Sequence, residues 1–328
     1  MARDAVEAVP RPSAPLELAP RLTAFGRRHR TALTIAGSVV ATALLVVALA
    51  GRRDEFITAL SSASVWVLAV TTLLQVVALV ARSEAWHLTI EAAGGAVSRR
   101  VLYRASSMQV LGSVLNGHLG VAARIAALRR SSPEVCPQVP TLIAAELPIL
   151  TVEAMLAAAA SFTLVAPLGL PWWLPLIGLA IVALVSAGLR QLARRKSREL
   201  WRGLAVLRSL NGGGRVVGLV LVAVFAQIFR NWILLRAVGV DASIFDATAV
   251  LIAVVTLGQL PVGPTVGAAA AVLILGRDGV AAAAAGGLLL TVTGTLGGLG
   301  FAAWAGADHV WSRLRRRRMP SSRSGIEA

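Results

Sequence analysis

The sequence predicts an all-α polytopic membrane protein with about six spanning helices and two re-entrant hairpins in an inverted-repeat arrangement. Of its 328 residues, 56% are hydrophobic and only 15% are charged, whereas soluble domains carry about 25% charged residues. Several apolar runs reach the ~20 residues that a helix needs to cross a bilayer. Basic residues gather in short segments beside these runs, which is typical of cytoplasmic loops.

The chain begins with residues 1–30, which carry prolines and arginines but no apolar periodicity, so we expect a disordered cytoplasmic tail. Residues 31–50 form the first predicted span. Their basic flank and the small residues before Gly51 also fit a cleavable signal peptide, which leaves two interpretations. Residues 63–81 form the second predicted span, and residues 82–104 are expected to be an amphipathic cytoplasmic connection.

The first interrupted region, residues 105–128, is weakly apolar and is interrupted at Asn116-Gly117-His118, with Gly120 close behind. Basic residues flank this region at both ends. A segment that leaves and re-enters the positive side of the membrane is more simply a re-entrant hairpin than a crossing. We therefore expect a hairpin whose tip lies near residues 116–118.

Three further spans are predicted at residues 140–167, 171–189 and 216–238. Trp172 and Trp173 lie at the start of one of them, where an aromatic belt is expected. Residues 190–215 hold eight basic residues against one acid. This is the strongest cytoplasmic signal in the chain, because positively charged loops stay inside.

A second interrupted region, residues 240–276, contains a cluster of helix-breaking residues at 261–267 inside apolar sequence. Backbone groups freed by such a break cannot face lipid, so the break is expected to be buried in protein or to line a wet cavity. Broken helices at membrane depth are where transporters bind their cargo. We interpret the two interrupted regions as halves of one site. The breaks in the second are Pro261, Gly263, Pro264 and Gly267.

Residues 280–305 form the last predicted span, and the integral membrane domain covers residues 31–306. Residues 307–328 are expected to form a basic cytoplasmic tail. With both termini in the cytoplasm the number of crossings is even, and six spans with two opposed hairpins satisfy every basic segment. Two short crossings in each interrupted region would give ten spans instead. The single lysine among many arginines indicates a GC-rich bacterial genome, and therefore a bacterial inner membrane.

Four charged residues in the apolar segments are candidates for binding a lipid headgroup. Arg124 follows the first break, and a guanidinium binds phosphate or carboxylate bidentately, although it could also reach the cytoplasmic surface. Glu146 and Glu153 are seven residues apart and therefore share a helix face. They could pair with Arg124 or Arg230, carry protons, or only hold helices together. Arg230 lies in the fifth span, where a charge costs at least ~2.5 kcal/mol and usually faces a cavity or a partner.

Asn116 and His118, at the tip of the first hairpin, are two further headgroup candidates. The four histidines are scattered and there is one cysteine, so no metal site is predicted. The chain lacks a nucleotide-binding phosphate loop, a catalytic triad and an extramembrane catalytic domain. We therefore expect no cofactor and no enzymatic activity. The net charge of +16 is ascribed to topology and to anionic lipid rather than to nucleic acid.

Residues 115–124, Leu-Asn-Gly-His-Leu-Gly-Val-Ala-Ala-Arg, resemble the Leu-Pro-Gly-Arg-x-Gly-Glu-x-x-Arg signature of the flippase-like membrane family. That family includes the membrane region of lysylphosphatidylglycerol synthases and related bacterial and archaeal membrane proteins. Residues 260–267 resemble the second Pro-Gly-rich motif of the family, and the likeness extends over about residues 30–306. The positions that match the first signature are Leu115, Gly117, Gly120 and Arg124.

The chain diverges from both motifs of that family. Glu146 occupies a position where the family carries a Glu-Arg pair, and Trp86 aligns with the tryptophan of an Arg-Trp pair. Both hairpin glutamates of the family are replaced, which separates this chain from any mechanism that depends on them. The residues at the divergent positions are Asn116, His118, Val121 and, in the second motif, an alanine near Ala270.

The resemblance implies a membrane region that moves anionic-backbone lipids between leaflets. The first hypothesis is therefore a protein that translocates or binds a phosphate-bearing lipid, passively or with an ion, through a cavity lined by Arg124, His118, Glu146 and Arg230. The alternative is a non-transporting accessory or scaffold subunit of a lipid- or glycan-assembly enzyme in the cell envelope. A third hypothesis, an enzyme acting on a lipid-linked sugar, is weaker because Glu146 and Glu153 are the acids near mid-membrane depth.

Overall fold

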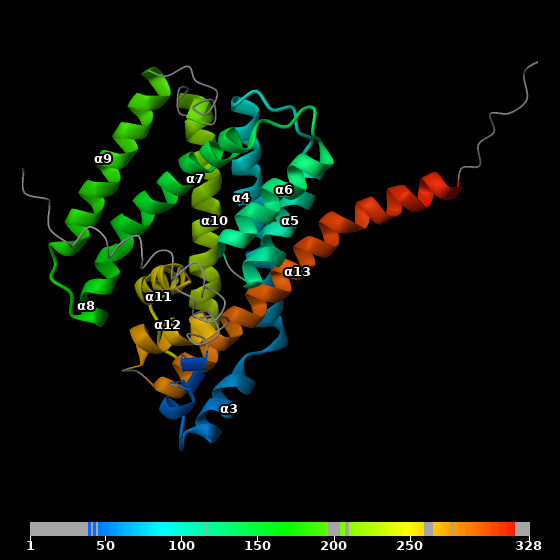
Figure 1. The fold of residues 1–328 in the computed structure, drawn as a ribbon. Helices are drawn as coiled ribbons and strands as arrows, with labels where there is room; N and C mark the ends of the chain where they lie inside the picture. The colour runs from blue at the N-terminus through cyan, green and yellow to red at the C-terminus, as the bar shows by residue number, and fades with distance from the viewer. Residues whose placement is uncertain are drawn as a thin grey trace, which may run out of the picture.

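The computed structural model describes residues 39–40, 42–43, 45–115, 117–195, 204–206, 210–258, 265–276 and 279–318, and all regular structure within them is helical (Figure 1). The chain folds into a bundle of long helices with shorter helices packed at its two ends. The helices are α3 (Arg53–Ser62), α4 (Val65–Ala92), α5 (Arg99–Leu115), α6 (Gly117–Ser131), α7 (Val139–Ala160), α8 (Val165–Leu168), α9 (Leu174–Arg195), α10 (Leu210–Ala237), α11 (Ile244–Leu257), α12 (Val266–Leu275) and α13 (Val280–Arg318), with a 3₁₀ turn, η2 (Ser161–Leu164), between α7 and α8.

Five helices in the described part of the chain are long and apolar enough to cross a membrane. They coincide with the five predicted spans that follow the first one, and a helical membrane protein is thereby confirmed. The first predicted span, residues 31–50, is described only in part. The tail before it, residues 1–30, lies outside the described residues. The five candidate spans are Val65–Ala92, Val139–Leu168, Leu174–Leu192, Asn211–Ala237 and Val280–Ala307.

One predicted boundary was wrong. Helix α4 continues to Ala92, so the predicted connection at residues 82–104 begins inside a helix. Several polar residues beyond the predicted span are buried against protein, as His87 illustrates with its ring nitrogen 3.1 Å from the Val97 carbonyl oxygen. Helix α13 continues to Arg318, so much of the predicted tail at 307–328 is helical.

Local sequence explains where several helices start and stop. Helix α11 begins with a capping box, because the Ser243 hydroxyl accepts the Asp246 N–H while the Asp246 carboxylate accepts the Ser243 N–H. The Ser64 side chain caps α4 in the same way by accepting the Val67 N–H. Helix α8 ends at Gly169, whose φ of 61° lies in the left-handed region that favours glycine.

Helices α4 and α10 form the antiparallel centre of the bundle. The Ser62 hydroxyl, just before α4, donates a 2.8 Å hydrogen bond to the carbonyl oxygen of Ala237, the last residue of α10. Small side chains line the contact between the two helices and allow the backbones to approach closely. The buried alanines of this contact are Ala78, Ala81, Ala223 and Ala226.

Helices α5 and α6 form a helical pair that begins and ends at the C-terminal end of α4. The loops that lead into and out of the pair meet, since the Ala96 N–H donates to the Val135 carbonyl oxygen at 3.3 Å. Gly95 lies so close to Pro137 that an added Cβ would come within 2.9 Å of its ring. The pair therefore enters and leaves the bundle at one end.

Helices α11 and α12 form a second pair at the opposite end, where α10 ends and α13 begins. An added Cβ at Gly286 of α13 would lie 3.0 Å from Leu235 and 3.2 Å from Val238, near the end of α10. Helix α12 packs on α13 at a glycine contact, because a Cβ at Gly267 would lie 2.5 Å from the Gly287 carbonyl oxygen. The two helix pairs thus approach the bundle from opposite ends.

Helix α13 also holds the α5–α6 pair, through an aromatic contact with α5. The Tyr103 ring lies 5.4 Å from the Trp304 ring and 6.2 Å from the Phe301 ring, measured between centroids. Below these rings, an added Cβ at Gly297 would meet Gln75 of α4 at 2.7 Å. Glycines on α13 thus let it lie close to α4 while its aromatic residues cover α5.

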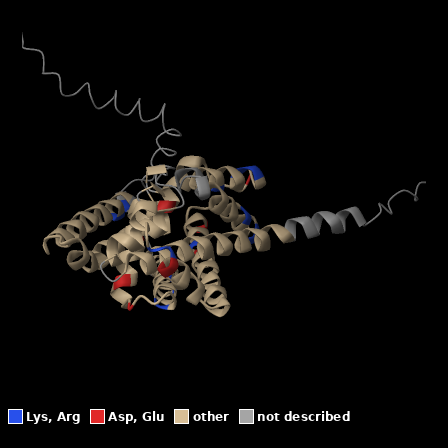
Figure 2. Ribbon diagram, turned by 90° about the horizontal axis from the view of Figure 1, so that it is seen from below, with Lys and Arg blue, Asp and Glu red and all other residues tan. Residues whose placement is uncertain are grey.

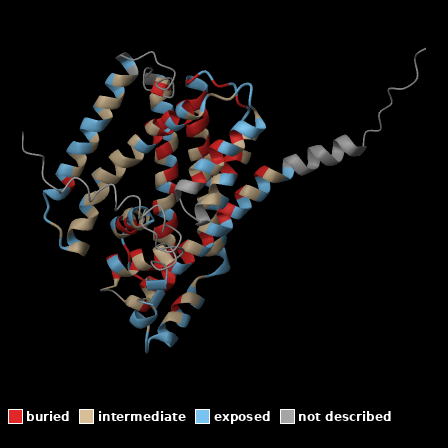
Figure 3. Ribbon diagram, viewed as in Figure 1, coloured by how far each residue is buried: buried red, intermediate tan, exposed pale blue. Residues whose placement is uncertain are grey.

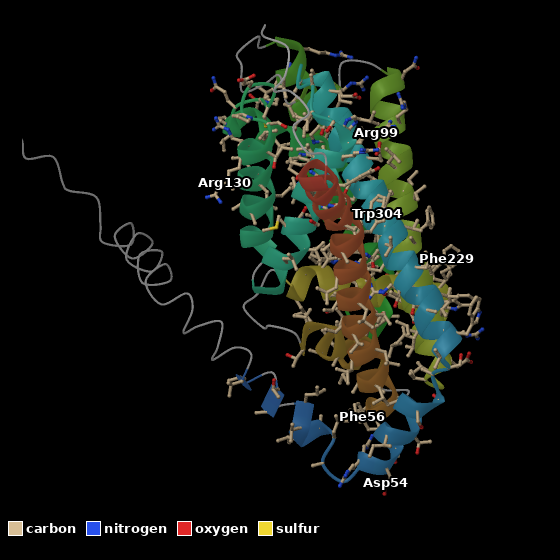
Figure 4. The ribbon with its side chains drawn as sticks, turned by 90° about the vertical axis from the view of Figure 1, so that its right-hand side faces the viewer. Asp54, Phe56, Arg99, Arg130, Phe229 and Trp304 are labelled. Carbon is tan, nitrogen blue, oxygen red and sulfur yellow. The ribbon has the colours of Figure 1, made fainter. Side chains whose placement is uncertain are left out.

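The two ends of the bundle differ in charge. We call the end that holds the α4–α5 and α6–α7 loops the basic end; Figure 4 shows Arg99 and Arg130 there and Asp54 at the other end. Viewed from that opposite end, acidic and basic positions lie close together (Figure 2). The opposite end carries Arg52, Arg53 and Arg236 against Asp54, Glu55, Asp241 and Asp246, whereas the basic end carries Arg99, Arg100, Arg129, Arg130, Arg190 and Arg194 against Glu84, Glu91 and Glu134.

Burial is concentrated where α4, α10 and α13 meet the two helix pairs (Figure 3). Helix α9 differs from the other candidate spans, because only 6% of its apolar window is buried. It lies at the edge of the bundle next to α7 (Figure 1). Large apolar residues such as Leu184 and Ile181 remain exposed on it. A surface of this kind suits a lipid environment.

Candidate functional site

The most deeply buried charge in the described chain is Arg124, at the middle of α6. Its guanidinium forms an ion pair with the Glu146 carboxylate of α7, and the two side chains expose 1% and 7% of their surface. A buried charge is tolerated when it is paired, because the partner offsets part of the desolvation cost. Arg124 is therefore an interior residue. The interpretation in which its side chain reaches the surface was wrong.

Trp86 of α4 completes the surroundings of Arg124. The guanidinium carbon lies 3.8 Å from the centroid of the Trp86 ring. A cation over an indole face is attracted by the ring quadrupole, and more strongly when both groups are removed from water. Trp86 itself is fully buried. Three helices, α4, α6 and α7, thus meet at one arginine.

A second ion pair lies beside the first. Arg82 of α4 donates to the Glu153 carboxylate of α7 at 2.5 Å, and both side chains are partly exposed. Arg82 and Glu153 are close enough to act on the charge of Arg124. We call Arg82, Arg124, Glu146 and Glu153 the charge cluster; its two positive and two negative charges balance.

The Arg124–Glu146 pair of the charge cluster lies about one third of the way into the bundle. Trp86 is six residues before the end of α4, and Glu146 is seven residues after the start of α7. At 1.5 Å per residue these positions are about 9–10 Å below the basic end. Arg124 is seven residues beyond Gly117, where α6 begins. The cluster is therefore placed between the basic end and the turn of the α5–α6 pair.

A second polar group, the Arg230 network, is centred on Arg230 of α10. Its Nη1 donates to the side-chain oxygens of Gln75 at 2.8 Å and Gln227 at 2.9 Å. Its Nη2 donates to the carbonyl oxygen of Leu290 and, at 3.4 Å, to the hydroxyl of Thr293. Among the described residues no carboxylate contacts Arg230. The network links α4, α10 and α13 through neutral acceptors.

The charge cluster and the Arg230 network are separate. On α4, Gln75 of the network and Arg82 of the charge cluster are seven residues apart, which is about 10 Å along a helix, and Gln75 is about 16 Å from Trp86. Glu146 and Glu153 are already engaged with Arg124 and Arg82. Of the two partners considered for these glutamates, Arg124 is the one that Glu146 contacts, and neither glutamate contacts Arg230 among the described residues. A cavity lined by both arginines stays a prediction.

The structure also relocates several of the predicted hairpin breaks. Gly117 is the first residue of α6 and Gly120 lies within it, so neither breaks the described helix. Gly267 lies within α12, where it makes the close contact with Gly287 of α13 described above. Residue Asn116, the His118 side chain, and Pro261, Gly263 and Pro264 lie outside the described parts of the structure.

A groove of about 860 Å³ opens on the far side of α10 from the α5–α6 pair. Helices α7, α8 and α10 form its walls, and α11 and α12 contribute to its lining. Three phenylalanines on its wall, Phe162, Phe225 and Phe245, are largely exposed. The polar groups at the groove include Thr248 and Asp246. It is a mostly apolar groove with a polar margin at the opposite end of the bundle.

Sequence reasoning missed several residues that shape the two polar groups. Arg82 was assigned to a connecting loop, and Trp86 was noticed through the family resemblance alone. Gln75 and Thr293 lie in apolar runs, where an isolated polar residue is a signal for a buried partner. That signal was present at Gln75, but the partner cannot be named from a single sequence.

No protein-family model, curated protein or solved structure matches this chain. Within the described residues, no group of three or more histidine, cysteine, aspartate or glutamate side chains could hold a metal ion. The chemistry on which a function can be argued is therefore that of the two polar groups, the groove and the helix pairs.

Proposed function

We propose that this protein is an integral membrane protein that binds a phosphate-bearing lipid and passes its headgroup across the bilayer without ATP hydrolysis. The observation that carries the proposal is the pair of short helical hairpins that approach the bundle from opposite ends. Hairpins and broken helices at membrane depth build the substrate sites of transporters, where their polar backbone and side chains line a path.

In this proposal the α5–α6 and α11–α12 pairs are re-entrant hairpins, and six spans with two opposed hairpins form an inverted-repeat arrangement. Helix lengths support it: α5 and α6 have 17 and 15 residues, and α11 and α12 have 14 and 10. At 1.5 Å per residue they extend about 15–26 Å, less than the ~30 Å hydrocarbon core. Ten full crossings would need longer helices.

The basic end faces the cytoplasm in this topology, and the membrane is the bacterial inner membrane. The excess of arginine over acid at that end supports the orientation, because positively charged loops are retained inside. The same arginines would attract anionic headgroups to the entrance of the α5–α6 hairpin. Arg99 and Arg130 in Figure 4 stand at this entrance.

Arg124 is the residue that would receive the headgroup at the cytoplasmic side. A guanidinium binds phosphate in the same bidentate way as carboxylate, so a lipid phosphate can take the place that Glu146 holds. Trp86 keeps its face on the guanidinium during such an exchange. Acyl chains stay in the bilayer, and the apolar groove beside α10 is large enough to hold one.

One observation favours the second candidate, a scaffold subunit of an envelope-assembly enzyme. Arg124 is 1% exposed and already paired, which is what a residue that only fixes α6 against α7 requires. In that case the charge cluster is structural and the protein moves no lipid by itself. Transport by the purified chain distinguishes the two candidates.

A vesicle assay tests the proposal. Purified protein is reconstituted into phosphatidylcholine vesicles that contain a trace of headgroup-labelled fluorescent phosphatidylglycerol, and dithionite then bleaches the accessible label. Translocation brings labelled lipid from both leaflets into contact with dithionite. In empty vesicles dithionite bleaches only the label of the outer leaflet. We expect the Arg124→Gln/Glu146→Gln double variant, which keeps the pair neutral, to lose translocation. The Arg236→Gln variant, at an exposed pair with Asp241, serves as the control.

Bleaching by the wild-type protein that equals empty vesicles would exclude autonomous translocation and favour the scaffold candidate. Unchanged translocation in the double variant would remove Arg124 from the path. Folding of each variant is checked by its elution as a single species in detergent, so that a loss of translocation is not confused with unfolding.

A further inference from the structure

Arg230 is a buried cation without a buried anion. Its side chain is 7% exposed, and its partners in the described chain are two amides, a hydroxyl and a backbone carbonyl. Arg82, Arg124 and Arg236 differ, because each has a carboxylate partner. Neutral acceptors satisfy the hydrogen bonds of a guanidinium but leave its charge uncompensated.

The position of Arg230 makes that charge costly. Arg230 is seven residues before the end of α10, Gln75 ten residues after the start of α4, and Thr293 thirteen residues after the start of α13. These separations correspond to about 10, 15 and 20 Å from the opposite end of the bundle. Since the hydrocarbon core is ~30 Å thick, the network lies near its middle, where charged residues mark substrate or ion sites.

The hydrogen bonds within the network fix the direction of its amides. A guanidinium only donates, so the oxygens of Gln75 and Gln227 must face Arg230. The Gln227 NH₂ group donates to the Gln75 oxygen at 3.0 Å, which therefore accepts two hydrogen bonds. The remaining amide hydrogens of both residues point away from these bonds and have no acceptor among the described residues.

The hydrogen-bonding groups of the network that have no partner are mainly donors. The Arg230 Nε–H is buried and has no acceptor in the described part of the chain. The NH₂ group of Gln75 has two free hydrogens and that of Gln227 has one. Both amides are partly exposed, so a ligand can approach them without opening the core. Unused N–H groups beside an uncompensated cation are what an oxygen-bearing anion requires.

Two glycines of α13 provide the space for the Arg230 network, because they carry no side chain. A Cβ at Gly294 would lie 2.9 Å from the Arg230 Nη2, and a Cβ at Gly297 would lie 2.7 Å from the Gln75 Cβ. Any larger residue at either position would displace the guanidinium or the amide. The sequence of α13 therefore accommodates the network at the depth where it meets α4 and α10.

We infer that Arg230, Gln75 and Gln227 form a binding site for an oxyanion of the phosphate class at the middle of the bundle. The anion supplies the negative charge that the network lacks and accepts hydrogen bonds from the two partly exposed amides, and also from the Arg230 Nε–H once the buried guanidinium turns toward it. It comes either from a lipid headgroup or from free phosphate. The headgroup source rests on the proposed function, and the site itself does not.

The test measures binding to the purified full-length chain in a maltoside detergent, which contains no phosphate. Inorganic phosphate and short-chain dihexanoylphosphatidylglycerol are titrated separately by calorimetry into the wild type and three variants. Arg230→Gln removes the cation, and Gln75→Glu places a carboxylate where the amide oxygen now meets Arg230 at 2.8 Å. Arg236→Gln is the matched control, because Arg236 lies on the same helix and is exposed.

We expect the wild type and Arg236→Gln to bind at least one probe. Arg230→Gln should raise the dissociation constant roughly tenfold or more, because a hydrogen bond to a charged group contributes at least the ~1.4 kcal/mol that a tenfold change represents. Gln75→Glu should lose binding while its midpoint of thermal unfolding stays equal or rises, since the internal carboxylate now compensates Arg230. Binding of the lipid alone identifies the headgroup as the source, and binding of both probes identifies phosphate itself.

The inference is overturned if the wild type binds neither probe, or if Arg230→Gln and Gln75→Glu bind as tightly as Arg236→Gln. Gln75→Glu decides the matter if Arg230→Gln does not fold, because it removes no buried group. The vesicle assay separates this result from the proposed function. Intact translocation without anion binding at Arg230 refutes the site alone, and anion binding without translocation refutes the function alone.

Discussion

Arg124 on α6 and Glu146 on α7 form an ion pair whose two side chains are 1% and 7% exposed. The pair ties a helix of the α5–α6 hairpin to a spanning helix, and Trp86 of α4 covers its cationic side. The neighbouring ion pair, Arg82 with Glu153, lies on α4 and α7 beside it. The position of the hairpin therefore depends on this pair.

Removing one member of the pair is expected to destabilise the protein strongly. Arg124→Ala leaves the Glu146 carboxylate buried without its partner, which typically costs ~3–5 kcal/mol. The double variant Arg124→Met/Glu146→Met removes both charges and fills the space with apolar side chains, so it should be markedly more stable than Arg124→Ala. The measurement is the midpoint of thermal unfolding in detergent, followed by intrinsic tryptophan fluorescence.

The Arg236–Asp241 pair provides the control for this comparison, because its side chains are 53% and 95% exposed. An exposed ion pair contributes ~0–1 kcal/mol, so Arg236→Ala should change the midpoint little. If Arg124→Ala were as stable as Arg236→Ala, the buried pair would not be what holds α6 against α7.

The sequence predicted most of the helices but not their ends. Five spans were recognised because long apolar runs are a direct requirement of the bilayer. The end of α4 was placed too early, since Arg82 and Glu84 read as the start of a polar loop. In the structure the last turns of α4 bury Trp86 and His87 against protein. Hydropathy cannot distinguish a polar residue that meets water from one that meets another helix.

The sequence predicted individual residues of the site but not which of them contact one another. Arg124, Glu146 and Arg230 were found because a charge in an apolar run demands a partner. The partners follow from the depth and rotation of neighbouring helices, which a single sequence does not contain. Gln75 and Arg230 are 155 positions apart in the chain and share a hydrogen bond. Asn116, His118 and the Pro261 to Pro264 segment remain predictions from the sequence.

The contact between α12 and α13 should be intolerant of any side chain at Gly267. A Cβ there would lie 2.5 Å from the Gly287 carbonyl oxygen and 2.6 Å from the Thr291 hydroxyl. Gly267→Ala must therefore separate the two helices, at a cost of roughly 1–3 kcal/mol typical of overpacking. We expect a lower midpoint of thermal unfolding in detergent.

Gly300 is the matched control for Gly267, since it lies on α13 and an added Cβ would meet nothing within 4 Å. Alanine is a better helix former than glycine by about 0.5–1 kcal/mol, so Gly300→Ala should leave stability unchanged or raise it. Equal midpoints for Gly267→Ala and Gly300→Ala would show that the close contact with Gly287 does not limit the side chain at position 267.

Cys136, the one cysteine of the chain, lies in the loop before α7 and should react slowly with maleimides at neutral pH. Burial raises the pKa of its thiol, and the thiolate is the reactive form. The rate of alkylation by N-ethylmaleimide should therefore still increase above the usual thiol pKa of about 8.5. The rate is measured against pH in mild detergent, with protein unfolded in dodecyl sulfate as the reference. Coinciding pH profiles in the two detergents would contradict the prediction.

The two hairpin tips should be accessible from opposite faces of the membrane. In a Cys136→Ser background, one variant carries His118→Cys and another carries Gly263→Cys. If the hairpins line a hydrated path, each cysteine reacts with a membrane-impermeant maleimide, because water reaches a break that lines a cavity. Position 118 should react in inside-out vesicles and position 263 in intact cells.

The chain with Cys136 alone is the orientation control for that experiment. Its loop joins α6 to α7 at the basic end, so it should react in inside-out vesicles after long exposure and stay unmodified in intact cells. Labelling of 118 and 263 from the same face would exclude an inverted-repeat arrangement. If neither cysteine reacted with the maleimide, the helix pairs would be ordinary packing elements. The buried arginines would then stabilise the bundle and would not line a translocation path.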